Sequence, residues 1–315
     1  MSFAGAMLIA MAIDAALGWP DALYRRIGHP VTWLGRLISA LETRLNRDGG
    51  KDLRRRLAGV VTAFVVAGTA ALAAWALAAL MPEGWIGMLL TGVMAWPLVA
   101  IRSMHQHVAA VQTPLAQGDL PRARHAVSMI VGRDTTRLDE AGVARAATES
   151  LAENTSDGIV APLFWGTLAG LPGIAAYKAI NTLDSMIGHR TPRFEAFGWA
   201  SARIDDGVNL IPARLTGVLF ALVSGAPRAA MAAMRRDARK HRSPNAGWPE
   251  AALAGALGLR LSGPRVYADR VANEPWVNEQ GRDPGARDLG RALALYRRAM
   301  CGLAVVMAAL AGLGW

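Results

Sequence analysis

A run of 25 residues without a formal charge, Leu57 to Met81, restricts the fold of this chain more than any other feature of its sequence. A helix of about 20 apolar residues crosses a hydrocarbon core about 30 Å thick, so this run is long enough to span a bilayer. Gly84 to Ile101 adds 18 uncharged residues directly after the turn at Pro82-Glu83. Because so short a turn leaves room only for an antiparallel return, the two runs are predicted to form a helical hairpin.

The remaining apolar segments are shorter or interrupted. We expect six apolar segments in all, at about residues 2–19, 57–81, 84–101, 158–177, 208–227 and 299–315. The first lacks the basic start of a cleavable signal peptide, so it is predicted to stay in the chain as a membrane-embedded helix. Pro162 and the Gly170-Leu171-Pro172-Gly173 run interrupt the fourth, and the fifth holds only 13 consecutive uncharged residues, from Leu215 to Pro227. Both are predicted to be kinked spans or re-entrant elements, whose freed backbone groups are satisfied inside the protein.

The distribution of charge indicates how the chain is oriented. Apolar residues make up 53% of the chain and charged residues only 18%, which is too apolar for an ordinary soluble domain. The net charge of +10 gathers in two stretches: residues 20–56 carry nine Lys and Arg against four acids, and residues 228–298 carry fourteen against seven. Basic loops beside membrane spans face the cytoplasm, so residues 20–56, 102–157 and 228–298 are predicted cytoplasmic loops. Because this topology accounts for the charge, we expect no nucleic-acid partner.

Together these features predict an all-α, polytopic integral membrane protein with about four to six membrane helices or re-entrant segments and cytoplasmic helical loops. We expect a single membrane-embedded catalytic domain over residues 1–315. Outside the apolar segments, the clearest predicted helices cover residues 135–153 and 225–242. The chain has one cysteine, Cys301, which excludes a disulfide framework and a cysteine metal cluster.

Polar side chains gather beside the apolar segments. Arg145, Glu149 and Glu153 lie at positions i, i+4 and i+8, so they share one face of a helix. The first two are also spaced for a surface ion pair, which is the alternative interpretation. The stripe ends at Glu153-Asn154 and Asp157, directly before an apolar segment. Oxygen ligands at a membrane boundary suit Mg²⁺, which binds carboxylates and keeps positions for substrate phosphates.

A second polar stretch follows residue 202. Asp205 and Asn209 are i, i+4 neighbours that could share a metal ion, and Arg203 and Arg214 could bind phosphate or carboxylate. The alternative is that the aspartates and the asparagine cap helices.

Two further polar groups also have structural alternatives. His29 precedes Pro30, which holds it in an extended or turn conformation, and the alternative to a catalytic role is an elbow at the membrane surface. Asn245 and Glu250 flank the start of a short Ala- and Leu-rich helix, where both could act as caps.

Seven short motifs follow one another along the chain: His29-Pro30-Val31-x-x-x-Gly35, Val131-Gly132-Arg133-Asp134-Thr135, Glu149-x-x-x-Glu153-Asn154-x-x-Asp157-Gly158, Pro162-Leu163-Phe164, Tyr177-Lys178-x-x-Asn181-Thr182-x-Asp184-Ser185-Met186, Ala202-Arg203-x-Asp205-Asp206-x-x-Asn209 and Ser243-Pro244-Asn245-Ala246-Gly247. In this order they closely resemble the CobD/CbiB family of cobalamin biosynthesis, the adenosylcobinamide-phosphate synthases. Each motif alone is weak, but together they cover essentially the whole chain. The sequence has no P-loop and no strand-linked G-x-G-x-x-G, so a nucleotide would bind outside the familiar loops.

The resemblance implies a multi-pass enzyme of the bacterial inner membrane with its active site facing the cytoplasm. Such an enzyme joins adenosylcobyric acid to aminopropanol phosphate, or a related amino alcohol, through an amide bond, and it uses ATP with Mg²⁺. The expected partners are the corrinoid substrate, the amino-alcohol phosphate, the lipid bilayer and other enzymes of the cobalamin pathway.

For such a reaction we assign hypothetical roles to the polar residues. The expected catalytic residues are His29, Glu149, Asp184, Asp205 and Asp206, with the choice of base between His29 and Glu149 left open. The expected substrate- or phosphate-binding residues are Arg133, Asp134, Lys178, Asn181, Arg203, Arg214 and Asn245. The expected ligands of Mg²⁺ are Glu153, Asp157, Asp205, Asp206 and Asn209.

One topological conflict follows from these roles. If the segments at 158–177 and 208–227 both span, residues 178–214 lie outside, away from ATP. We therefore expect these segments to be re-entrant or to wrap a cavity that opens to the cytoplasm.

Two other classes of protein compete with this interpretation. A Mg²⁺-dependent polyprenyl-type transferase should carry paired D-D-x-x-D boxes, and the only candidate here ends in Asn209. A non-enzymatic membrane transporter should show related inverted halves, which the sequence does not display.

Overall fold

The computed structural model describes residues 1–47, 51–267, 270–272 and 274–315, and it is helical over 76% of the chain with almost no strands. Four of its helical stretches are long and apolar enough to cross a membrane, and six if two bent helix pairs each count as one span. The predicted all-α, polytopic membrane architecture is therefore confirmed. By its internal contacts the chain divides into two compact units. Unit 1 comprises residues 1–100, 161–209 and 306–315, and unit 2 comprises residues 101–160 and 210–305.

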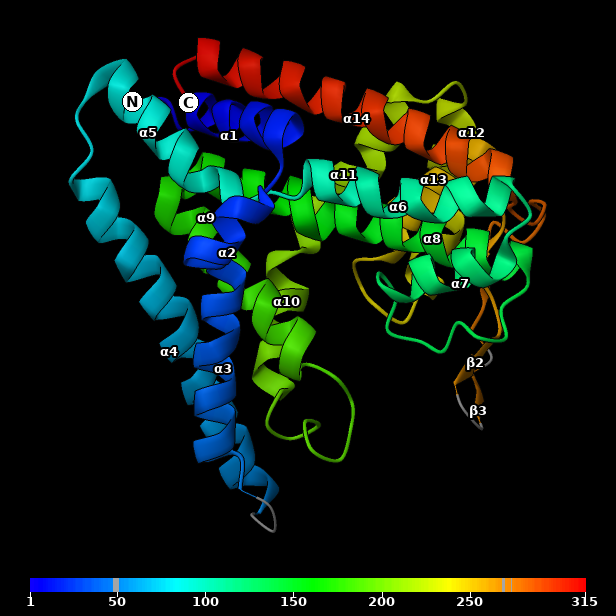
Figure 1. Cartoon of the computed structure of the whole chain (residues 1–315), viewed down its shortest axis with the longest axis horizontal. Helices are drawn as coiled ribbons and strands as arrows, with labels where there is room; N and C mark the ends of the chain where they lie inside the picture. The colour runs from blue at the N-terminus through cyan, green and yellow to red at the C-terminus, as the bar shows by residue number, and fades with distance from the viewer. Residues whose placement is uncertain (48–50, 268–269, 273) are drawn as a thin grey trace. The chain divides into compact units, whose positions relative to one another are not determined.

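Unit 1 is built mainly from the first third of the chain (Figure 1). Its elements are α1 (Phe3–Leu17), α2 (Asp21–Ile27), α3 (Pro30–Leu45), α4 (Asp52–Ala79), α5 (Gly84–Ala95), the 3₁₀ turn η1 (Trp96–Leu98), α9 (Ala161–Ile187) and α10 (Trp199–Val208). Helices α3, α4, α9 and α10 pack on one another around Ile38, Val66, Leu183 and Phe197. A Cβ at Gly59 of α4 would overlap the Phe197 carbonyl oxygen, so this close approach requires glycine. The packing fixes α9 beside α10, the two helices that carry Asp184, Asp205 and Asp206.

Helix α9 is broken in its middle. Ala169 and Gly170 have non-helical backbone angles, with φ of +62° at Gly170, and Pro172 follows. Glycine adopts such a φ without steric cost, and a proline lacks the amide hydrogen that the preceding turn needs. The interruption predicted in the segment at 158–177 is thus confirmed.

The predicted hairpin of residues 57–81 and 84–101 is not formed as expected. Helix α5 packs against α1 instead of returning along α4, which packs against α3, α9 and α10. The α1–α5 contact is tight, because a Cβ at Gly92 would collide with Ile9 and with the Ala6 carbonyl oxygen. A short turn keeps the start of α5 near the end of α4, but the packing of α5 against α1 sets the direction of the α5 axis.

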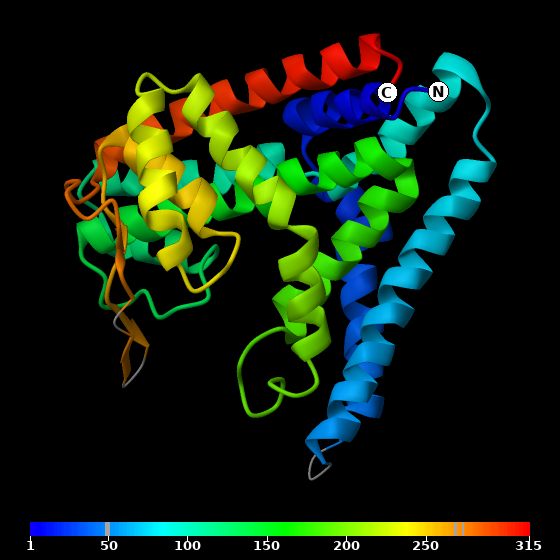
Figure 2. The same cartoon turned by 180° about the vertical axis from the view of Figure 1, so that it is seen from behind.

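Unit 2 contains the remaining helices (Figure 2). Its elements are α6 (Ile101–Ala116), α7 (Leu120–Ser128), α8 (Glu140–Thr155), the π-turn η2 (Ser156–Val160), α11 (Leu210–Val223), α12 (Pro227–Asp237), the 3₁₀ turn η3 (Ala238–Lys240), α13 (Gly247–Leu257), and α14 (Ala286–Gly312), whose last residues belong to unit 1. Two short antiparallel pairs complete it, β1 (Leu261–Ser262) with β4 (Trp276–Val277) and β2 (Arg265–Tyr267) with β3 (Arg270–Ala272).

The centre of unit 2 is formed by α8 and α13, which pack against each other and are buried on most of their faces. The helix predicted at 135–153 begins only at Glu140, because Asp139 caps it by accepting a hydrogen bond from the Gly142 amide at 2.7 Å. The helix predicted at 225–242 covers only Pro227–Asp237 and then tightens into η3.

Candidate functional site

The residues that the sequence analysis singled out fall into two groups, one in each unit. Unit 1 holds His29, Lys178, Asn181, Asp184, Arg203, Asp205, Asp206 and Asn209. Unit 2 holds Arg133, Asp134, Glu149, Glu153, Asp157, Arg214 and Asn245. The predicted magnesium ligands are thus shared between the units, and each group is described by itself.

In unit 1, a buried chain of hydrogen bonds links α9 to the end of α10. The Tyr177 hydroxyl donates to Oδ1 of Asn209 at 2.9 Å, and Nδ2 of Asn209 donates to Oδ2 of Asp205 at 3.0 Å. All three residues are buried. The i, i+4 pairing of Asp205 with Asn209 expected from the sequence is present, and Tyr177 is a further member that the motif contained without a predicted role. The chain fixes the orientation of the Asp205 carboxylate.

The other oxygen of this carboxylate has no such partner. Oδ1 of Asp205 is buried and makes no hydrogen bond to any residue that the structure describes. Asp184 and Asp206 lie close enough to act on Asp205 electrostatically, and the Asn181 side chain is a further hydrogen-bond partner of its carboxylate. A buried carboxylate oxygen is costly without a hydrogen bond, a cation or a proton. The carboxylate can therefore take either a cation or a proton at this oxygen.

A divalent cation fits this group only with help from substrate. Among the described residues, no three or more His, Cys, Asp or Glu side chains are grouped so that they could hold a metal ion. Mg²⁺ is commonly bound by one or two carboxylates together with water and substrate phosphates. Arg203, whose Nη1 lies 3.3 Å from Oδ2 of Asp206, adds a cation at the edge of the group. The donor set suits Mg²⁺ that arrives with a phosphate ester.

His29 has a structural role at the start of α3. Its Nδ1 accepts a hydrogen bond from the Val31 amide at 3.2 Å, and its backbone amide donates to the Thr32 hydroxyl at 3.2 Å. This reciprocal pair is a capping box, followed by proline at the first helical position. The ring also packs edge-on against Trp19. The alternative of a structural elbow therefore describes this residue in the structure.

In unit 2, a buried polar network joins motifs that are more than 90 residues apart in the sequence. Nη2 of Arg133 lies 3.0 Å from Oε2 of Glu149, and Oε1 of Glu149 accepts a hydrogen bond from the Ser262 amide at 2.7 Å. The Ser262 hydroxyl donates to Glu250 at 3.2 Å, and Nε2 of His241 lies 3.6 Å from the other oxygen of Glu250. Glu149, Glu250 and Ser262 are all buried. The network encloses two carboxylates and satisfies both.

The turn at residues 243–247 continues this network. Nδ1 of His241 accepts a hydrogen bond from the Ser243 amide at 3.0 Å, and the Ser243 hydroxyl accepts from the amides of Asn245 and Ala246, both at 3.2 Å. No side chain caps α13, whose N-cap is Ala246. The alternative of capping by Asn245 and Glu250 is therefore wrong, because Glu250 points instead to Ser262 and His241.

Ser262 was missed by the sequence analysis. It has a φ of +57°, in the left-handed region that few residues other than glycine adopt. In this conformation the backbone amide of Ser262 points at the Glu149 carboxylate. A single serine in a short strand carries no spacing signal, so only the tertiary structure identifies it.

Arg145 shares its helix with Glu149 but pairs elsewhere. It forms an ion pair with Asp283, and its guanidinium lies 4.7 Å from the centre of the Trp276 ring. Arg260 lies 4.6 Å from the same ring and also bonds Asp283. Hydrogen bonds from Arg260 lower the pKa of Asp283 to about 2. The i, i+4 ion pair that the spacing allowed is replaced by partners more than 130 residues away.

Other predicted residues of unit 2 lie apart from the network. Asp134 is exposed, and the Thr136 amide and hydroxyl, which donate to it at 2.8 and 2.7 Å, lower its pKa. Arg214 stacks over Trp248 at 4.4 Å and donates to the Leu210 carbonyl. Glu153 is exposed and Asp157 is half-buried in η2.

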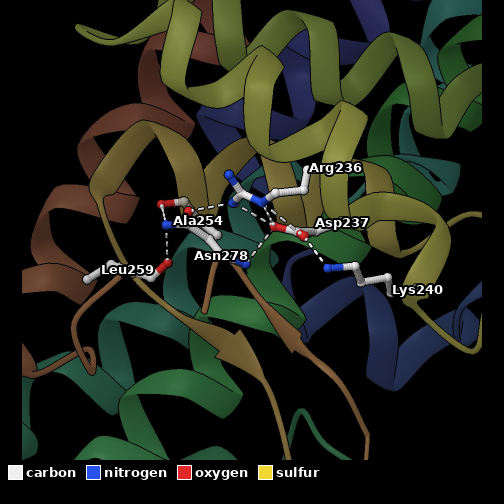
Figure 3. Close-up of polar contacts among 6 residues, drawn as sticks. All are labelled: Arg236, Asp237, Lys240, Ala254, Leu259 and Asn278. Carbon is white, nitrogen blue, oxygen red and sulfur yellow. Dashed lines mark hydrogen bonds and ion pairs between the residues drawn. The ribbon is translucent and has the colours of Figure 1, made fainter. Parts of the chain in front are cut away.

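Asp237 is another buried carboxylate, and the sequence analysis did not single it out (Figure 3). Burial alone would raise its pKa, but hydrogen bonds from Arg236 and Lys240 outweigh that effect and lower it. The Asn278 amide also donates to it at 3.0 Å, and the Asn278 side chain donates to the Leu259 carbonyl at 2.8 Å. This cluster ties the end of α12 to the segments around α13 and β4, so its role is structural.

The sequence comparisons agree with the motifs. The family described as CobD/Cbib protein matches residues 7–296. A Rhodobacter capsulatus protein named Cobalamin biosynthesis protein CobD is 67% identical over 307 residues, which cover 98% of this chain and 97% of that protein. Proteins of the same name from Brucella suis biovar 1 and Rhizobium meliloti are 47% and 44% identical, each over 97% of this chain and 96% of their own length. No solved structure matches. The chain therefore belongs to the CobD/CbiB family.

Proposed function

We propose that this chain acts in cobalamin biosynthesis as an adenosylcobinamide-phosphate synthase of the bacterial inner membrane. It would join adenosylcobyric acid to aminopropanol phosphate, or a related amino alcohol, at the expense of ATP. The observation that carries this proposal is the buried Asp205 oxygen without a partner, beside Asp184 and Asp206, in a member of the CobD/CbiB family. Three neighbouring aspartates, one of them with a buried oxygen that has no hydrogen-bond partner, are suited to receive Mg²⁺ with the phosphates of ATP.

The reaction must first activate a carboxylate, which is a poor electrophile. In the simplest route a carboxylate oxygen attacks the γ-phosphorus of ATP, the bond to the bridging oxygen breaks, and ADP leaves. The neutral amine then attacks the acyl carbon, phosphate leaves, and one proton passes to a base. Both steps involve highly charged phosphates, so positioned cations supply most of the rate enhancement.

In unit 1, Asp205 and Asp206 would hold Mg²⁺, with Asn209 as a further proposed ligand. Bound there, the ion would neutralise charge on the transferring phosphate. Asn209 already bonds both Tyr177 and Asp205, so it also orients the carboxylate. Three other residues of unit 1 would bind the phosphate: Lys178, Asn181 and Arg203.

In unit 2, Arg133 would bind phosphate, and Glu149 would position the Arg133 guanidinium. Both oxygens of Glu149 already accept hydrogen bonds, from Arg133 and from Ser262. That leaves fewer lone pairs for a substrate proton and favours the positioning role over the role of base. Arg214, Asn245 and Asp134 are the other proposed substrate-binding residues of this unit.

The test is a direct assay of the amide. Purified protein in detergent is incubated with adenosylcobyric acid, aminopropanol phosphate and Mg-ATP, and the products are identified by mass. We expect adenosylcobinamide phosphate together with ADP and inorganic phosphate, and no amide when any one substrate is left out. Absence of the amide from folded protein would contradict the function. Release of AMP and pyrophosphate would keep the ligase activity but contradict the acyl-phosphate route.

The orientation has its own test. We propose that the end of α9 opens to the cytoplasm, so a cysteine introduced by Ser185→Cys, in a Cys301→Ser background, should react with a reagent added to inside-out vesicles. Labelling only by a reagent confined to the periplasm would overturn this orientation.

A further inference from the structure

Unit 2 contains a cavity of about 390 Å³ that the proposed reaction does not use. It lies between the α11–α12 junction at Ser224–Ala226, the end of α13 and the side of α14. Its charged lining residues are both arginines, Arg291 and Arg298, and most of the others are apolar, including Leu257 and Leu295. A ligand for this cavity must therefore be anionic at one end and apolar at the other.

The two arginines differ in how they are held. Nη1 of Arg291 donates to Oδ1 of Asp288 at 3.0 Å and to the Leu257 carbonyl at 3.3 Å, which fixes its guanidinium. Asp288 also pairs with Arg282, so one carboxylate is shared by two cations. Arg298 is exposed and makes no hydrogen bond or ion pair to any residue that the structure describes. The cavity thus has an excess of positive charge and one cation ready to receive an anion.

The place of Arg298 in the sequence sets its depth in a membrane. It is the last charged residue of the chain, because residues 299–315 carry no Asp, Glu, Lys or Arg. Helix α14, on which it lies, is one of the helices long and apolar enough to cross a bilayer. Arginines at the end of an apolar span lie at the level of the lipid headgroups. The cavity therefore lies where headgroup phosphates are concentrated.

We propose that this cavity binds the headgroup of an anionic phospholipid, with Arg298 and Arg291 paired to its phosphate. The apolar lining and the exposed side chains of Leu222 and Val305 then contact the acyl chains. The first turn of α12, next to Ala226 in the lining, adds the positive end of a helix dipole. Basic pockets between membrane helices bind such lipids by the same combination of charge and apolar contact.

The test measures which lipid stays bound. The protein is reconstituted in nanodiscs of phosphatidylcholine with phosphatidylglycerol, extracted in mild detergent, and examined by native mass spectrometry. Wild type should retain phosphatidylglycerol in preference to phosphatidylcholine, and Arg298→Gln should lower that retention about fivefold. The matched control is Arg297→Gln, which removes the same charge from the same helical turn but contacts His105 and does not line the cavity. Equal retention of both lipids by wild type, or an equal loss in both variants, would overturn the proposal.

Two further variants and a competing anion distinguish a bound lipid from a bound soluble phosphate. Ala294→Trp fills the cavity without changing charge, and it should lower retention as Arg298→Gln does, with an unchanged melting temperature as the folding control. Arg298→Lys should keep most of the retention. If millimolar inorganic phosphate displaces phosphatidylglycerol, or binds lipid-free protein in an Arg298-dependent manner, the cavity takes a soluble phosphate and the lipid assignment is wrong.

Discussion

The two groups of polar residues solve the burial of carboxylates in opposite ways. In unit 2, Glu149 and Glu250 are enclosed by Arg133, Ser262 and His241, so each carboxylate has partners from the protein itself. In unit 1, Asp205 has one oxygen tied to Asn209 and the other left without a partner, beside two further aspartates. Protein partners that satisfy a buried carboxylate hold structure in place, whereas a carboxylate oxygen without a protein partner is available to a ligand or a proton.

This contrast separates stability from catalysis. Removing one member of the unit 2 network leaves a buried charge unpaired, so the folded state should become less stable. Removing the unpartnered carboxylate of unit 1 relieves a buried charge, so folding should be spared while activity is lost. The variants below test this separation, from the largest expected effect to the smallest.

The largest effect is expected from Glu149→Ala, which strands the Arg133 guanidinium in the interior of unit 2. Breaking one side of a buried ion pair typically costs about 3–5 kcal/mol. We expect a large drop in the unfolding temperature of the detergent-solubilised protein. The double variant Arg133→Met/Glu149→Leu, which removes both charges, should recover most of that loss. A stable single variant would mean that the network does not hold unit 2 together.

Asp205→Asn should give the opposite pattern. The amide keeps an acceptor for Asn209 and removes the charge, so the unfolding temperature should be unchanged or higher. Loss of an electrostatic group that acts on the transferring phosphate should lower kcat by about 10²–10³-fold. The control is Glu83→Gln, an exposed acid of unit 1 whose side chain caps no helix, and its kcat should stay at the wild-type value. Wild-type turnover in Asp205→Asn would remove this residue from the proposed magnesium site.

A smaller, pH-dependent effect is expected from Asp283. Because Arg260 lowers its pKa from 3.8 to about 2, the ionised carboxylate stabilises the folded state above pH 3.8, and this contribution fades as the pH falls toward 2. The side chain is 39% exposed, so solvent screening should limit the gain to about 1 kcal/mol. The unfolding temperatures of wild type and Asp283→Asn should differ at pH 5 and converge near pH 2. A difference that is constant over this range would argue against the ion pair as its source.

The features that could be predicted from the sequence are those set by residues close together in the chain. The break in α9 follows from Gly170 and Pro172, and the Asp205–Asn209 contact follows from their i, i+4 spacing. The direction of α5 and the partner of Arg145 were beyond it, because α1 and Asp283 are remote in the sequence and compete successfully with the neighbours that spacing suggests. The network around Glu149 could not be predicted either, because it includes the backbone amide of Ser262. Every residue except proline has such an amide, so the residue type does not indicate the contact.

The smallest effect concerns Arg214, which the sequence placed among phosphate-binding residues and the structure places over the Trp248 ring. A cation–π contact of a partly exposed arginine is worth about 0.5–1 kcal/mol. A double-mutant cycle with Arg214→Gln and Trp248→Leu should therefore give a coupling of that size in stability. The two roles separate in kinetics: if Arg214 binds substrate phosphate, Arg214→Gln should raise KM for aminopropanol phosphate or ATP well beyond Trp248→Leu. If the two variants have the same KM values, Arg214 serves unit 2 only as a partner of the tryptophan, and Arg133 is left as the phosphate-binding arginine of that unit.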